Sequence, residues 1–308
     1  MTRITTTAGT TSAAWANARS GWLARVADFV ELAKPRIVAL ELVTVVVAYH
    51  LASPRGIEAW VLVHALIGAA LIAASAGALN QWLEQGSDAR MSRTANRPLP
   101  AGRLVPWQVV AFGIVTLALG AVELALFVNL TTAGVALATW LIYVAAYTPL
   151  KSRSPLNTAV GAVSGALPIL IGWTAAGAAI DVRAAALVAA MFLWQFPHFM
   201  AIAWLYRADY ARAGQRMLTV VDPTGLRAAA QAVVAALALI PVTMVPALSP
   251  QAGSPAVYCW WTMLLGTAQA AAAVLFLIER NDVAARRLLR ASLLYLTCWM
   301  GVLAMVAV

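Results

Sequence analysis

Long stretches without charge are what most constrain the fold of this chain. Nearly uncharged apolar runs recur along its whole length, and they cover about 37–54, 59–83, 104–150, 154–180, 184–206, 228–278 and 291–308. An α-helix crosses a membrane with about 20 apolar residues, so five runs have the length of one crossing and two have the length of two. Turn signals at 129–134 and 246–255 divide the two long runs. We therefore predict an all-α polytopic membrane protein with nine transmembrane helices.

The positions of the charged residues support nine crossings and give them a direction. When the N-terminus is placed in the cytoplasm, nearly all of the 21 lysines and arginines fall on the cytoplasmic side, and only Arg55 and Arg183 fall outside. The C-terminus then lies outside. A soluble domain is excluded because 62% of the residues are apolar and 11% are charged. The net charge of +9 therefore reports membrane topology, and we expect no nucleic-acid partner.

The sequence divides into two regions of different composition. Residues 1–35 are rich in Thr and Ala and then amphipathic, with Trp22, Val26 and Phe29 at helical spacing, which favours a helix on the membrane surface over a disordered tail. Residues 36–308 form the intramembrane domain. The acid-poor start also has features of a mitochondrial presequence, so the mitochondrial inner membrane is the alternative to a bacterial inner membrane.

One segment concentrates polar groups at the end of the second predicted crossing. Asn80, Glu84 and Asp88 stand at i, i+4 and i+8, so one helix face carries all three over about 12 Å. Amide and carboxylate oxygens of this kind are ligands for a hard divalent cation. The arginines that follow supply planar guanidinium groups, which bind phosphate oxygens through two parallel hydrogen bonds. These arginines are Arg90, Arg93, Arg97 and Arg103. The segment predicts a magnesium-diphosphate site.

A second polar helix end is predicted on the same membrane face, because the second and sixth crossings both run from outside to inside. His198 and Asp209 are eleven residues apart, which in a continuous helix places them on one face and about 16 Å apart in depth. Pro197 is expected to bend this helix next to the histidine. Tyr206 and Tyr210 flank the aspartate. We predict that the two helix ends enclose one site, in which His198 lies deepest.

Four stretches of the sequence carry a further signal: LAKPRIVAL, NQWLEQGSDARMSRTANRPLPAGR, YTPLKSRSPLNTAVGAVSGALPILIGW and WQFPHFMAIAWLYRADYARAGQRML. Together they resemble the haem O synthase (protohaem IX farnesyltransferase) branch of the UbiA-type intramembrane prenyltransferases, over residues 32–240. The pieces RTANRPLPAGR and WQFPHF are specific to that branch, whereas an Asn/Asp-rich helix end indicates only the wider superfamily. The resemblance implies a UbiA-type bundle whose active site opens to the cytoplasmic face.

The resemblance assigns roles to particular positions. It implies that the metal ligands are Asn80, Glu84, Asp88 and Asp209, with Glu84 standing where the family usually has Asp. These four residues and His198 are the expected catalytic residues, and His198 is expected to face the haem as an axial ligand, a base or a hydrogen-bond partner. The remaining candidates are expected to bind substrate: Arg90, Arg93, Arg97, Lys151, Arg153, Tyr206, Tyr210 and Arg212.

The activity that the resemblance implies is transfer of a farnesyl group from farnesyl diphosphate to a vinyl group of haem B. Water addition completes the reaction and gives haem O and diphosphate. Mg²⁺ is the expected cofactor, because it stabilises the negative charge that develops on the leaving group. A water-poor membrane bundle protects the allylic cation from hydrolysis. Besides membrane lipid, the expected partners are haem A synthase or assembly proteins of terminal oxidases.

Three other functions compete with this interpretation. The nearest is a prenyltransferase of the same superfamily that acts on a quinone-precursor or chlorophyll-type acceptor. The WQFPHF stretch and the single acid Asp209 argue against it. A transporter is disfavoured because the polar sites gather at one membrane face rather than near the midplane. The third alternative is a structural assembly factor for respiratory complexes.

Overall fold

The chain folds into a bundle of long helices. The computed structural model describes residues 9–53, 56–248 and 254–306, and these residues contain helices and no strand. Within them, nine segments are long and apolar enough to cross a membrane, which confirms the predicted count and an integral membrane protein. α1 (Gly9–Leu32) precedes these segments. In chain order they are α2 (Pro35–Ala52), α3 (Ala59–Leu83), α5 (Pro106–Phe127), α6 (Leu130–Leu141) with η1 (Ile142–Tyr147) and α7 (Thr148–Leu150), α8 (Asn157–Ala166) with α9 (Pro168–Ala175), α10 (Val182–Leu205), α13 (Leu226–Met244) with η2 (Val245–Leu248), α14 (Pro255–Glu279) and α15 (Asp282–Val306).

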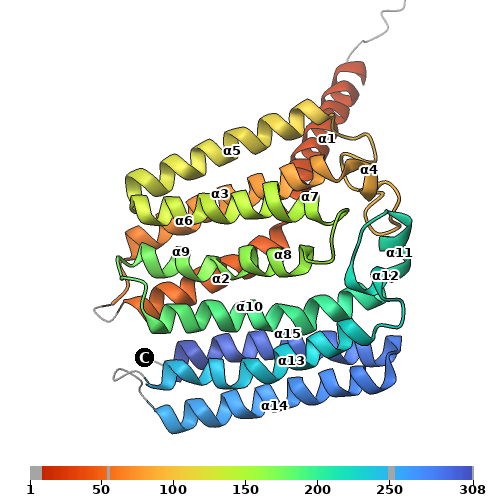
Figure 1. Cartoon of the computed structure of the whole chain (residues 1–308). Helices are drawn as coiled ribbons and strands as arrows, with labels where there is room; N and C mark the ends of the chain where they lie inside the picture. Colours follow the sequence, from red (N-terminus) through yellow and green to blue (C-terminus); the bar gives the residue numbers. More distant parts are fainter. Residues whose placement is uncertain (1–8, 54–55, 249–253, 307–308) are drawn as a thin grey trace, which may run out of the picture.

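Short connecting helices gather at one end of the bundle (Figure 1). This end carries α4 (Gln85–Asp88), α11 (Arg207–Arg212) and α12 (Leu218–Val221). Both α3 and α10 end here, so the predicted meeting of the second and sixth crossings is confirmed. The polar loops that follow these two helices are thereby brought together.

Prolines begin and interrupt the helices as their chemistry requires. Pro35, Pro106 and Pro255 occupy the first turn of their helices, where a missing N–H costs no hydrogen bond. Pro168 separates α8 from α9 within one crossing. Pro197, in contrast, lies inside α10, which continues past it to Leu205.

Glycines allow α3 and α5 to approach closely. A Cβ atom on Gly120 would lie 2.9 Å from the carbonyl oxygen of Gly68, and one on Gly113 would lie 2.7 Å from Cγ of Leu79. Packing of small residues matters between membrane helices because lipid provides no hydrophobic force to join them. α3 is therefore fixed along its length, and its last turn holds Asn80 in a defined place.

The interior of the bundle is filled by aromatic side chains and alanines. Trp173 of α9, Tyr258 of α14 and Trp299 of α15 are at most 1% exposed. Their polar atoms are satisfied, because the Tyr258 hydroxyl donates to the carbonyl of Thr243 at 2.7 Å and the Trp173 indole donates to the carbonyl of Ala179 at 2.9 Å. This packed centre supports the helices whose ends build the site.

Candidate active site

Three connections between helices meet at the end of the bundle. The loop after α4 is joined to the turn after α11, because the Arg90 guanidinium donates to the carbonyl of Ala213 at 2.8 Å. The segment after α7 joins the same turn, since the backbone N–H of Arg216 donates to the carbonyl of Lys151 at 2.7 Å. The Asn157 side chain also donates to the carbonyl of Arg216, at 3.3 Å. The predicted polar segments therefore form one site.

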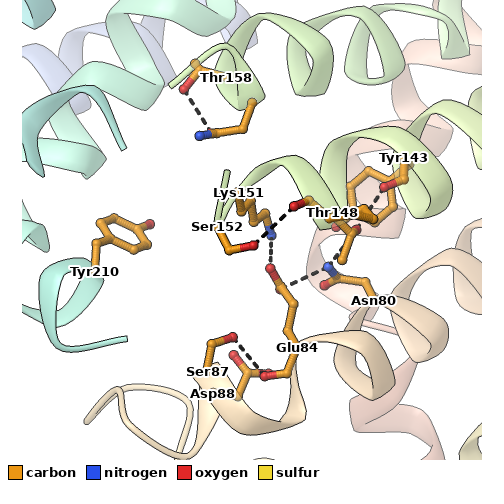
Figure 2. A network of polar contacts seen from close by, with 12 residues as sticks. Asn80, Glu84, Ser87, Asp88, Tyr143, Thr148, Lys151, Ser152, Thr158 and Tyr210 are labelled. Carbon is orange, nitrogen blue, oxygen red and sulfur yellow. Dashed lines mark hydrogen bonds and ion pairs between the residues drawn. The ribbon is translucent and has the colours of Figure 1, made fainter. Parts of the chain in front are cut away.

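Asn80, Glu84 and Asp88 lie in one helical register although α3 ends at Leu83. Glu84 has φ −96° and ψ 5°, and α4 begins at the next residue. Backbone bonds of helical spacing continue across the junction, from Glu84 N–H to the Asn80 carbonyl at 3.0 Å and from Asp88 N–H to the Glu84 carbonyl at 2.8 Å. The three side chains are 1%, 8% and 0% exposed. Figure 2 shows them together beside Lys151 and Thr148.

Each of the four predicted metal ligands is paired with a cationic side chain. The pairs are Lys34 with Asn80 at 2.7 Å, Lys151 with Glu84 at 2.8 Å, Arg97 with Asp88 at 2.6 Å, and Arg212 with Asp209. Asn80 also bridges Glu84 and Thr148, because its amide donates to the carboxylate at 2.9 Å and to the hydroxyl at 3.1 Å. Each cation is therefore placed so that it could leave its present partner for a bound anion, while a metal bound with that anion takes the partner.

Basic side chains outnumber acidic ones at this site, because Lys34, Lys151 and Arg97 surround the two carboxylates of Glu84 and Asp88. Burial lowers the pKa of Lys34 to about 7, and the cations of Arg97 and Lys151 push it in the same direction. Burial by itself raises the pKa of Glu84, but the charge and hydrogen bond of Lys151, the charge of Lys34 and the hydrogen bond from Asn80 together outweigh it, so this pKa falls below its ordinary value. Such a surplus of buried positive charge is what a multiply charged anion requires.

The donor set fits a magnesium ion that shares its coordination with a substrate. Asp88 Oδ1 is buried and has no hydrogen-bond partner among the described residues, so one carboxylate oxygen is left for a cation. Burial raises the pKa of Asp88, against the pull of Arg97. The described part of the chain contains no cluster of three or more His, Cys, Asp or Glu side chains suited to a metal. Mg²⁺ is commonly bound by one or two carboxylates together with phosphate oxygens and water, which this arrangement permits.

Arg93 lies between two tyrosines at the edge of the site. Its guanidinium is 5.1 Å from the centre of the Tyr206 ring and 5.3 Å from that of Tyr210, and it donates to the Tyr210 hydroxyl at 3.1 Å. The hydroxyl of Ser92 donates to Asp209 at 3.0 Å, which ties the same loop to α11. The predicted residues Arg93, Tyr206, Tyr210 and Asp209 are therefore neighbours. Arg153 is exposed.

The continuous helix that was predicted to carry both His198 and Asp209 is interrupted. α10 ends at Leu205, and Tyr206, with φ −108° and ψ 19°, separates it from α11, which carries Asp209. His198 is held against α15, where its Nδ1 lies 3.0 Å from Oγ of Ser292. It stacks on Trp194 with ring centres 5.1 Å apart, and the Trp194 indole donates to the carbonyl of Ser292 at 2.7 Å.

Lys34 is the residue of this site that sequence reasoning missed. The distribution of charge gives Lys34 only a topological role, yet its ammonium group donates to Asn80 at 2.7 Å and to the Tyr143 hydroxyl at 3.4 Å. Its φ of 52° is uncommon for a residue other than glycine. The available signal was a lone lysine immediately before Pro35, at the membrane boundary of the first crossing.

Comparison with known proteins agrees with this geometry. The sequence profile described as the UbiA prenyltransferase family matches residues 42–300. A protoheme IX farnesyltransferase of Solibacter usitatus is 43% identical over 285 residues, covering 90% of this chain and 97% of the relative. The protein of the same name from Rhodopirellula baltica is 44% identical over 273 residues, covering 87% and 95%.

Solved structures show the same fold at lower sequence identity. A digeranylgeranylglyceryl phosphate synthase superposes with a TM-score of 0.75 at 16% identity, covering 92% of this chain and 98% of that one. A UbiA homologue from Archaeoglobus fulgidus bound to GPP and Mg²⁺ superposes with a TM-score of 0.64 at 16% identity, covering 90% and 100%. Because the family profile matches most of its length and relatives are more than 40% identical to it, the chain belongs to the UbiA prenyltransferase family.

Proposed function

We propose that this membrane enzyme transfers the farnesyl group of farnesyl diphosphate to a vinyl group of haem B. Water adds to the product, which gives haem O and free diphosphate. The acceptor follows from the relatives that are named protoheme IX farnesyltransferases and span nearly the whole chain. The observation that carries the chemistry is the buried row of Asn80, Glu84 and Asp88 faced by three cations at one end of a membrane bundle.

The oxygen-bearing and the cationic side chains of the site would bind different parts of the substrate complex. Asn80, Glu84, Asp88 and Asp209 would hold Mg²⁺, which supplies positive charge to the leaving diphosphate when bound. The cations now paired with these residues would turn toward the phosphate oxygens. Arg97 suits this role because its planar guanidinium matches two oxygens at once, whereas Lys34 and Lys151 act as compact charges.

The remainder of the reaction requires an apolar, dry space. The bond between farnesyl C1 and the diphosphate oxygen breaks, and C1 then forms a bond to the terminal vinyl carbon of haem B. The positive charge moves to the other vinyl carbon, where water adds and loses a proton. The bundle excludes other water from the allylic cation, and burial of the fifteen-carbon chain contributes roughly 0.8 kcal/mol per carbon group.

The proposed topology places the active site on the cytoplasmic side of a bacterial inner membrane, with the C-terminus outside. α1 would lie on the membrane surface, since Trp22, Leu23, Val26 and Val30 are exposed apolar residues at helical spacing. Haem A synthase or oxidase assembly proteins would then receive the product. After Cys259 and Cys298 are replaced by alanine, labelling of single cysteines introduced at Ser152 and at Ala179 with a membrane-impermeant reagent tests the two sides.

A product assay tests the proposed function. The protein in detergent is incubated with haem B, farnesyl diphosphate and Mg²⁺, and the extracted haem is examined by mass spectrometry. We expect a haem whose mass has increased by one farnesyl group and one hydroxyl group, and reversible loss of the product on adding EDTA. Unchanged haem, together with prenylation of an aromatic quinone precursor, would instead identify a different acceptor.

Replacement of Arg93 by lysine is expected to raise KM for farnesyl diphosphate about fivefold to tenfold. Lysine keeps the charge but loses the planar group that lies 5.1 Å from the ring centre of Tyr206 and 5.3 Å from that of Tyr210. The matched control is Arg287→Lys, at an exposed arginine of α15. Steady-state kinetics with saturating haem B measure the effect, and equal KM changes in the two variants would show that the site is misplaced.

Replacement of His198 by alanine tests whether this histidine faces the haem. Its Nδ1 is engaged by Ser292, which leaves Nε2 as the atom for an iron or a proton. If it ligates iron, we expect a changed visible spectrum of bound haem and weaker haem binding, while the affinity for farnesyl diphosphate holds. Lost turnover with an unchanged spectrum would favour the base role, and unchanged turnover would leave a packing role against Trp194.

A further inference from the structure

Arg103 connects the arginine-bearing loop, residues 89–105, to α1. Its Nε donates to Asp28 and its Nη2 donates to Glu31, both at 2.7 Å. Its Nη1 donates to the backbone carbonyl of Asn96, also at 2.7 Å. One guanidinium group therefore binds two carboxylates of α1 and the loop backbone at the residue before Arg97. Charge-assisted contacts of this forked kind fix geometry more firmly than single neutral hydrogen bonds.

The end of α1 is itself fixed to the transmembrane bundle. The Gln81 amide of α3 donates to the carbonyl of Leu32 at 3.2 Å, and the Leu32 side chain is fully buried in a cluster with Val109 of α5. The Phe29 ring packs on Phe112 of α5 with centres 5.3 Å apart. The last turns of α1 are therefore a rigid support for whatever binds to them.

The 89–105 loop contacts both α11 and α1, but only the α11 contacts use residues of the proposed substrate site. On the α11 side its contacts use Ser92, Arg93 and Asp209, which belong to the proposed site. On the α1 side the contact is Arg103, whose side chain is 39% exposed and binds α1 carboxylates instead of site residues. This second support holds the loop without using a group that has to rearrange around the diphosphate.

We infer that Arg103 is a positioning residue for the reaction: it fastens the 89–105 loop to Asp28 and Glu31 and thereby places Arg97 for diphosphate binding. This inference rests on the proposed function. Arg103 acts through α1, so its two carboxylate partners share the role. The helix α1 then contributes to the active site, since its carboxylates hold in place the loop that carries the phosphate-binding arginines.

A mutant cycle tests this inference. Arg103→Gln is expected to raise KM for farnesyl diphosphate about fivefold, which corresponds to roughly 1 kcal/mol of binding, while kcat stays within about twofold. The double variant Asp28→Asn/Glu31→Gln is expected to reproduce that KM. The triple variant is expected to be no worse than either, because both changes break the same contact. Arg103→Lys, which retains the charge but loses the fork, is expected to give an intermediate KM.

Limited proteolysis reports on the 89–105 loop without requiring turnover, so it separates an effect on the loop from an effect on the reaction. Trypsin is expected to cleave after Arg90 or Arg93 several times faster in Arg103→Gln and in the double variant than in the wild type. Arg286→Gln, at an exposed arginine of α15, is the control for lost surface charge. Effects of Arg103→Gln and the double variant that add in the triple variant would overturn the inference, as would an unchanged KM. Absent haem farnesylation in the wild type would instead count against the proposed function, since the cleavage rates report the contact by themselves.

Discussion

Replacement of Asp88 by asparagine is expected to lower turnover by about 100-fold or more while the protein stays folded in the membrane. Asp88 is fully buried, its Oδ2 accepts from Arg97 at 2.6 Å, and its Oδ1 has no partner among the described residues. Asparagine has nearly the same shape but brings no negative charge. The variant therefore removes the anionic oxygen that a metal requires and leaves Arg97 without a counter-ion.

The measurement is the rate of haem O formation at saturating substrates, with and without added Mg²⁺. Glu123→Gln is the matched control, because Glu123 is also a carboxylate in a close pair, with His64 at 2.6 Å. It lies near the C-terminal end of α5, whereas the site is at the end of the bundle where α5 begins. We expect its turnover to stay within about twofold. Full activity of Asp88→Asn, or of a metal-free preparation of the wild type, would end the assignment of this residue to the metal.

Much of the fold follows from the sequence because its signals are local. The break predicted at 129–134 is an example, since α5 ends at Phe127 and α6 begins at Leu130. Asn129 defines where α6 begins, because its side chain accepts from the backbone N–H of Thr132 at 2.8 Å and caps the helix. Apolar run length and one capping residue are enough to define such an element.

The break at Tyr206 depends on contacts that no local pattern encodes. Neither proline nor glycine stands between α10 and α11. The Arg207 guanidinium donates to the carbonyl of Trp204 at 2.6 Å, and Asp282, at the start of α15, accepts from both side chains. These contacts satisfy the end of α10, so the helix that was expected to run continuously from His198 to Asp209 is interrupted.

Lys34 illustrates the same limit within the site. A single lysine at a membrane boundary satisfies the positive-inside rule and needs no further explanation. Its contact with Asn80, which is 46 residues away in the sequence, depends on the left-handed corner between α1 and α2. In contrast, the Asn80, Glu84 and Asp88 row was predictable, because the spacing of four residues places them together within one helical run.

Replacement of Glu84 by glutamine is expected to reduce turnover about 100-fold, whereas Glu84→Asp should retain activity within several-fold. Glu84 accepts from Lys151 at 2.8 Å and from Asn80 at 2.9 Å, and it is 8% exposed. Glutamine removes the charge that balances Lys151 and brings an amide donor toward that cation. Aspartate keeps the charge, so a shift of one methylene is the main cost.

The kinetic comparison needs a stability measurement beside it, because breaking a buried pair costs about 3 to 5 kcal/mol when one partner is left charged. We therefore expect Glu84→Gln to lower the thermal midpoint of the detergent-solubilised protein, and the pair variant Glu84→Gln/Lys151→Met to recover stability but not turnover. Recovery of both would mean that Glu84 serves only to balance Lys151. Recovery of stability alone separates the folding role of this pair from its role in holding metal and diphosphate.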